Sequence, residues 1–174
     1  MPRIEPVGQK TYTFWRHLDT IGDGTGDTDF IGDYSVTPVV PRMDCAEDEF
    51  LFIHYITAII EDSTPFDPSK YGNLAALTNG ITMGVYGPDG VEKHRFNQHT
   101  INTAAEWMHQ AESTVAEQGT GAHVFIARLE FTGISADGYR LYPGDSLRVV
   151  LSDNFTGLDD HEFVVHGTRR ATNV

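Results

Sequence analysis

The longest apolar run of the chain, residues 49–61 (EFLFIHYITAIIE), is apolar at almost every position. If its side chains alternate as in a strand, Phe52 and Ile60 lie on one face and Leu51 and Ile53 on the other. Aromatic and β-branched residues dominate this run and good helix formers are few, which favours a strand. We expect a central strand covered on both sides, and a buried helix is the alternative.

Other short apolar segments also predict strands, and turn-forming residues separate them. Residues 81–86 and 91–96 flank the sequence GPDG at residues 87–90. Proline presets the turn there and glycine accepts a positive φ, so these segments predict a β-hairpin. Residues 35–40 contain Pro38, which confines this extended piece to a sheet edge. The other expected strands cover residues 11–16, 122–131, 147–151 and 163–166.

Residues 100–111 are the one good helix candidate, because Asn102 or Thr103 can cap a segment rich in alanine. About eight expected strands, with turn signals every ~8 to 15 residues, form the pattern of a sandwich. The sequence therefore predicts an all-β fold: an antiparallel β-sandwich, jelly-roll-like, with one short helix. We expect residues 1–10 to form an N-terminal arm. Residues 11–174 would form the sandwich domain, with an acidic Gly/Asp loop at residues 18–34.

Size and charge narrow the possible functions. The 174 residues suit one domain, and a hydrophobic content of 40% supports a packed core. Acidic residues outnumber basic ones by 25 to 12 and no basic run exceeds Arg169-Arg170, which disfavours nucleic-acid binding. No stretch approaches the ~18 apolar residues of a membrane span, and the N-terminus lacks an apolar signal core. An acidic chain with only three lysines is typical of a halophilic source; an ordinary acidic protein is the alternative.

Candidate catalytic groups are few. Cys45 is the only cysteine and lies among acidic residues, which indicates a packing residue or a passive surface thiol, not a nucleophile. His161 and His166 resemble a zinc-protease pair, but their separation of five residues would place them on opposite faces of a strand. No catalytic residue is predicted, and we expect a protein that is not an enzyme.

The acidic loop is the nearest approach to a cation site. Calcium prefers several oxygen ligands gathered in a flexible loop, and Asp23, Asp27 and Asp29 could supply them within residues 19–33. Their spacing does not match an EF-hand. We therefore expect a solvated loop or contact arm and no bound cofactor, and Ca²⁺ at these three residues is the alternative.

Four segments stand out together: residues 15–27 (WRHLDTIGDGTGD), 32–35 (GDYS), 71–81 (YGNLAALTNGI) and 147–167 (LRVVLSDNFTGLDDHEFVVHG). They resemble a family of small virion structural proteins of tailed viruses of bacteria and archaea. In that family the proteins are commonly found beside the major capsid protein. The order and spacing of the segments hold from about residue 11 to residue 167.

The resemblance implies a capsid decoration or cement protein. Such a β-sandwich would bind the major capsid protein or other virion proteins. It would be made in the host cytoplasm and would end on the capsid surface of the virion. A jelly roll of this kind would form a dimer or trimer. The alternatives are another virion component, such as a receptor-binding tail protein or a head–tail connector, and a sugar-binding or enzymatic jelly roll.

On this interpretation, aromatic residues of the arm and loops would contact the shell, although each could equally belong to the core. For the two tryptophans, a core or interface anchor is favoured over a carbohydrate platform. The candidate contact residues are Phe14, Trp15, Phe30, Tyr34, Phe66, Tyr71 and Trp107.

Overall fold

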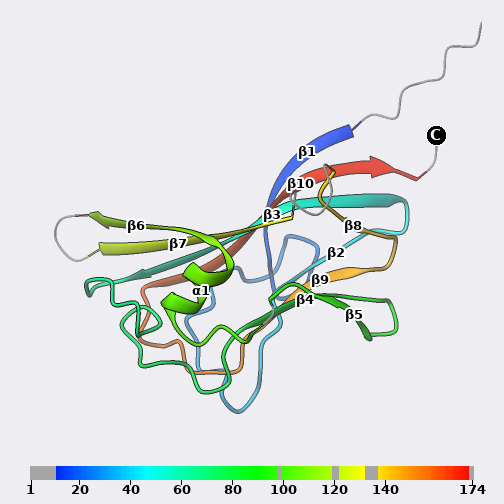
Figure 1. Ribbon diagram of the computed structural model, residues 1–174. Helices are drawn as coiled ribbons and strands as arrows, with labels where there is room; N and C mark the ends of the chain where they lie inside the picture. Colours follow the sequence, from blue (N-terminus) through cyan, green and yellow to red (C-terminus); the bar gives the residue numbers. More distant parts are fainter. Residues whose placement is uncertain (1–10, 98, 119–121, 132–136, 173–174) are drawn as a thin grey trace, which may run out of the picture.

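The computed structural model describes residues 11–97, 99–118, 122–131 and 137–172 and contains two facing antiparallel sheets (Figure 1). In Figure 1 the larger sheet lies over the smaller one, and the β6–β7 hairpin extends beyond it. These layers confirm the predicted β-sandwich. The predicted arm at residues 1–10 lies outside the described residues.

The six-stranded sheet has the spatial order β1 (Thr11–His17), β10 (Asp160–Ala171), β3 (Glu49–Asp62), β7 (Ala122–Glu130) and β6 (Glu112–Gln118), and β8 (Tyr139–Leu141) also pairs with β3. The four-stranded sheet has the order β2 (Arg42–Asp44), β9 (Ser146–Val150), β4 (Thr82–Tyr86) and β5 (Glu92–Arg95). The first strand thus pairs with the last, and β2 pairs with β9. This nested pairing is consistent with a jelly-roll-like arrangement.

Strand β3 is the central strand that the apolar run predicts, so the helix alternative is wrong. The predicted assignment of its two faces is also wrong. The register with β10 shifts between His166 and Gly167, and His54 is the extra residue of β3 that reverses the alternation of side chains. Leu51 and Ile53 are therefore buried before the bulge, and Ile56 and Ile60 after it.

The second face of β3 is not covered by another layer. Its residues are mostly half-buried, and arginine side chains lie over the aromatic rings near its start. The Arg140 guanidinium lies 4.3 Å from the centroid of the Phe50 ring, and that of Arg170 lies 4.6 Å from the Phe52 ring. Cation–π contacts thus explain apolar residues on a face that the sequence pattern assigned to a second covering layer.

The inner face of the large sheet is covered in two parts. The small sheet covers the half near β1 and β8, and α1 (Ala104–Gln110) with its preceding loops lies beneath β6 and β7 (Figure 1). Phe66 of these loops stacks on Phe125 of β7 with ring centroids 5.3 Å apart. The helix begins where expected, since the Glu106 carboxylate accepts the Thr103 N–H at 3.0 Å. It is shorter than the predicted residues 100–111.

The hairpin around residues 87–90 is confirmed, and Gly90 has the positive φ of 78° that the turn requires. The strand expected at residues 35–40 is wrong: only Val39 pairs there, by an isolated bridge to Leu151, because residues 35–37 form an exposed bend. The described residues form ten strands. The unpredicted β2, β6 and β8 are short or polar, so they lack the apolar alternation of a half-buried strand.

Candidate functional site

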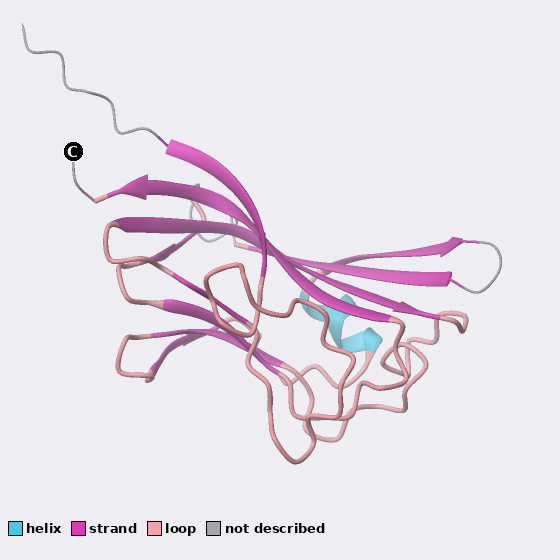
Figure 2. Cartoon of the chain, turned by 180° about the vertical axis from the view of Figure 1, so that it is seen from behind, coloured by secondary structure: helices cyan, strands magenta, loops and turns pink. Residues whose placement is uncertain are grey.

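The long loops gather at one end of the sandwich (Figure 2), where hydrogen bonds join residues 32–35 and 71–81 to the segment 147–167. The Tyr34 N–H donates to the Asp153 carbonyl at 2.9 Å, and the Phe155 N–H donates to the Gly32 carbonyl at 2.9 Å. Residues 32–35 are thereby joined to the loop that precedes β10. These two segments therefore belong to one connected scaffold of loops.

Asp153 is the centre of this scaffold. Its buried carboxylate accepts backbone N–H groups from Thr78 at 2.8 Å, from Asn79 at 3.1 Å and from Gly80 at 2.8 Å. The donors lie more than 70 positions away in the sequence. A buried ionised carboxylate is stable only when such donors surround it. Asp153 thus holds residues 78–80 against the β9–β10 loop.

A buried histidine joins three further segments at the same end. The Tyr71 hydroxyl lies 2.8 Å from His161 Nε2, and His161 Nδ1 lies 3.2 Å from the Phe30 carbonyl oxygen. A carbonyl only accepts, so Nδ1 carries the proton and Nε2 accepts from the tyrosine. Burial lowers the pKa of His161 to about 4 and raises that of Tyr71. At neutral pH this is an uncharged structural pair with no access to solvent.

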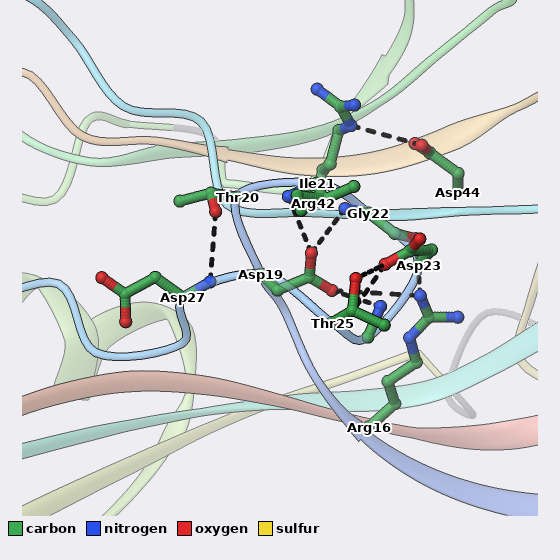
Figure 3. Close-up of polar contacts among 11 residues, drawn as sticks. Arg16, Asp19, Thr20, Ile21, Gly22, Asp23, Thr25, Asp27, Arg42 and Asp44 are labelled. Carbon is green, nitrogen blue, oxygen red and sulfur yellow. Dashed lines mark hydrogen bonds and ion pairs between the residues drawn. The ribbon is translucent and has the colours of Figure 1, made fainter.

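The acidic Gly/Asp loop is organised around Asp19, not around the three predicted aspartates (Figure 3). The fully buried Asp19 carboxylate accepts the N–H groups of Ile21 at 2.7 Å, Gly22 at 2.6 Å and Gly24 at 2.6 Å. Burial raises its pKa, but the three N–H donors and Arg16 outweigh burial and hold the pKa below its usual range. Gly22 and Gly24 have φ values of 98° and 92°, which wrap the backbone around the carboxylate.

Asp19→Asn should lower the free energy of unfolding by about 2 kcal/mol, because an amide has one acceptor oxygen and turns an N–H₂ group toward the donors. Urea unfolding at neutral pH measures the loss, and the amides of Gly22 and Gly24 should exchange with solvent faster. Asp23→Asn is the matched control in the same loop. Its exposed side chain contacts only Thr25, so it should lose less than ~0.5 kcal/mol. Equal losses in both variants would contradict the central role of Asp19.

Each of the three candidate calcium ligands accepts a hydrogen bond from another group of the protein. Asp23 accepts from Thr25, Asp27 accepts the Asp29 N–H at 3.3 Å, and Asp29 accepts the His161 N–H at 3.2 Å. Across residues 11–97, 99–118, 122–131 and 137–172, no group of three or more His, Cys, Asp or Glu side chains could hold a metal ion. The conformation of the acidic loop is held by backbone N–H groups that donate to aspartate carboxylates.

The other candidate reactive groups are separated. His161 faces the core, whereas His166 lies on the outer face of the same strand, as the five-residue spacing predicts. Cys45 is buried, and burial raises the pKa of its thiol to about 12. It is therefore a packing residue and not a surface thiol.

The seven candidate contact residues have very different positions. Three of them, Phe30, Tyr71 and Trp107, are fully buried, which favours the core alternative for these residues over a contact with the shell. Phe14, Tyr34 and Phe66 are half-buried and pack against the core. Of the seven, Trp15 alone is exposed, at 64%.

Trp15 belongs to an aromatic row that crosses three strands on the outer face of the large sheet. It lies opposite His166 of β10, which lies opposite Tyr55 of β3. The ring centroids of Trp15 and His166 are 4.5 Å apart, and Tyr55 stacks on His166 at 4.7 Å. No local sequence pattern marks this row, because cross-strand register brings its members together.

A second exposed feature is the loop of residues 35–37, which leads toward β2 (Figure 1). Val36 at its tip is 91% exposed. Both sides of its base are fixed: the Tyr34 N–H donates to Asp153, and Val39 exchanges two backbone hydrogen bonds of 3.0 Å with Leu151. The loop thus presents an exposed apolar side chain, and backbone hydrogen bonds hold both of its ends.

Comparison with known proteins finds no matching family model, no matching curated protein and no matching solved structure. No helix in the described part of the chain is long and apolar enough to cross a membrane.

Proposed function

We propose that the protein is a non-catalytic virion component that decorates or cements the outer surface of a tailed-virus capsid by binding the major capsid protein. The observation that supports this most is the scaffold centred on Asp153 and His161. The segments that resemble the virion family are those that build this scaffold. We infer that this loop end presents the contacts to a shell.

The loop of residues 35–37 is the proposed contact with the shell. An exposed valine on a base that is fixed at both sides loses little conformational entropy when it binds. A small apolar anchor suits a pocket between capsid subunits, and many symmetric copies would add their affinities on one particle. The expected dimer or trimer would match a symmetric contact site on the shell.

Val36→Asp should weaken binding to assembled shells at least about tenfold, because a charge in an apolar pocket is costly to desolvate. The measurement is cosedimentation of the purified protein with shells that lack it, and with free capsid subunits for comparison. Val91→Asp is the matched control, since Val91 is also exposed but lies in the β4–β5 hairpin. Equal loss in the two variants would reject the loop as the contact, and no recruitment of the wild-type protein would reject the function.

Copy number separates the possible positions in the virion. A decoration protein should be present in roughly hundreds of copies per purified particle, in keeping with the symmetry of a shell. Quantitative mass spectrometry against the major capsid protein gives the number. About a dozen copies or fewer would instead assign the chain to the tail or the neck.

A further inference from the structure

A groove of about 390 Å³ crosses the outer face of the large sheet beside the aromatic row. It runs from Trp15 on β1 to Glu112 on β6, and Thr57, Thr114 and Ile126 line it between them. Its volume lies within the range of ligand sites, ~300–1,000 Å³. This face is separate from the loop of residues 35–37 that we propose as the capsid contact.

Trp15 is an exposed ring that is already held in place. The edge of Tyr55 approaches it at an interplanar angle of 76°, with ring centroids 5.7 Å apart, and His166 packs beside it. Burial, and then the neighbouring His54, lower the pKa of His166, so the row is uncharged at neutral pH. An indole fixed by its neighbours binds a flat apolar surface with little loss of side-chain entropy.

The far side of the groove supplies hydrogen-bonding groups whose charges are largely paired. Arg128 lies over the Tyr55 ring at 4.9 Å and bridges the carboxylates of Glu112 at 3.0 Å and Glu130 at 2.9 Å. Guanidinium N–H groups and carboxylate oxygens thus stand side by side, next to the Thr57 hydroxyl. One cation with two carboxylates leaves a slight negative charge, which repels anionic ligands.

We propose that this groove binds an uncharged saccharide, with one sugar ring stacked on Trp15 and its hydroxyls bonded to Arg128 and Glu112. The C–H face of a pyranose fits an exposed indole, and vicinal hydroxyls need adjacent donors and acceptors. A protein partner fits less well, because a protein interface has several buried aromatic anchors, and here one large ring is exposed among ion-paired charges. On a virion this face would give the particle affinity for glycans, a role beyond attachment to the shell.

The test begins with the purified full chain on an array of neutral, sialylated and uronate-containing oligosaccharides. Neutral glycans should bind, and acidic ones should bind at least about tenfold more weakly. Titration calorimetry with the best neutral glycan then compares variants. Trp15→Ala and Arg128→Ala should each weaken binding at least about tenfold, because each removes a principal contact.

Tyr12→Ala is the matched control. Tyr12 is an aromatic residue of the same strand with 50% exposure, on the opposite face of the sheet, so its loss should change affinity less than about twofold. Circular dichroism and thermal unfolding verify that each variant is folded. Failure of every neutral glycan to bind at millimolar concentration, or unchanged affinity in Trp15→Ala, would overturn the proposal.

Two further outcomes assign the groove to a different occupant and also overturn the proposal. One is equal binding of acidic glycans. The other is self-association in sedimentation velocity that Trp15→Ala abolishes, which would make the groove an interface between copies. Shell binding is measured separately: Val36→Asp should lose shells and keep the glycan, and Trp15→Ala should do the reverse.

Discussion

Asp153→Ala should lower the free energy of unfolding by about 4 kcal/mol, the largest effect that we expect of a single substitution. The change leaves the N–H groups of Thr78, Asn79 and Gly80 without their shared acceptor. The Gly80 contact is buried, so water replaces the carboxylate poorly there. Because the donors are distant in the sequence, the loss also releases residues 78–80 from the β9–β10 loop.

Urea unfolding at neutral pH measures this effect. Asp153→Asn keeps the shape and one acceptor oxygen and should lose about 2 kcal/mol. Asp159→Ala removes an exposed acidic residue of the same loop and should stay within ~0.5 kcal/mol of wild type. Asp153→Ala keeps the backbone carbonyl that accepts the Tyr34 N–H at the base of the 35–37 loop, so shell binding should weaken only as far as release of the β9–β10 loop moves this carbonyl. A loss below ~1 kcal/mol would show that residues 78–80 do not depend on this carboxylate.

The second large effect is a loss of stability in acid that comes from His161. Its pKa is about 4 in the folded protein and 6.5 in the unfolded chain. Between these values the unfolded state binds the proton and the folded state does not, so stability falls as pH falls. The contribution is fully present above about pH 7 and is lost by about pH 4, and a difference of this size corresponds to about 3 kcal/mol.

The difference between wild type and His161→Gln isolates this contribution, because the other titrating groups largely cancel. Burial raises the pKa of the neighbouring Asp160 to about 6, which acts in the opposite direction within this window. Because Asp160 is present in both proteins, the difference in unfolding free energy between wild type and His161→Gln should shrink by about 3 kcal/mol from pH 7.5 to pH 4. His109→Gln removes an exposed histidine and should follow the wild-type curve. If His161→Gln does not fold, the imidazole resonances of the wild-type protein should still show a neutral ring at pH 5. A charged ring there would contradict the prediction.

The two predicted effects have a common origin in the loop end. Asp153 and His161 both lie within residues 147–167, and both join this segment to loops far away in the sequence. Their burial explains why conspicuous residue types need not be catalytic. A histidine beside a tyrosine hydroxyl could serve as an acid–base pair in an open cleft, but here neither atom reaches solvent.

The features that the sequence predicted correctly depend on local patterns. The run at residues 49–61 required a central strand, because aromatic and β-branched side chains disfavour a helix. The GPDG turn required a hairpin, because proline and glycine restrict the backbone directly. The five-residue spacing of His161 and His166 separated them on a strand without any knowledge of the partner strands.

The misplaced residues depended on contacts between distant segments. The bulge at His54 reversed the faces of β3, and no local pattern marked it. In the sequence, a buried aromatic residue looks the same as an exposed one. Only the packing of the folded chain shows that Phe30, Tyr71 and Trp107 lie in the core. The acidic loop was expected to be solvated, yet Asp19 is fully buried by donors from its own backbone.

By itself, then, the sequence determined the all-β class, the central strand, the hairpin and the short helix, because side-chain alternation and turn chemistry act over a few residues. Tertiary structure decided which aromatic residue is free to bind. Trp15 became an exposed platform because strand register placed His166 and Tyr55 beside it on the uncovered face of the sheet. Register is a relation between strands that are far apart in the chain, and no single segment encodes it.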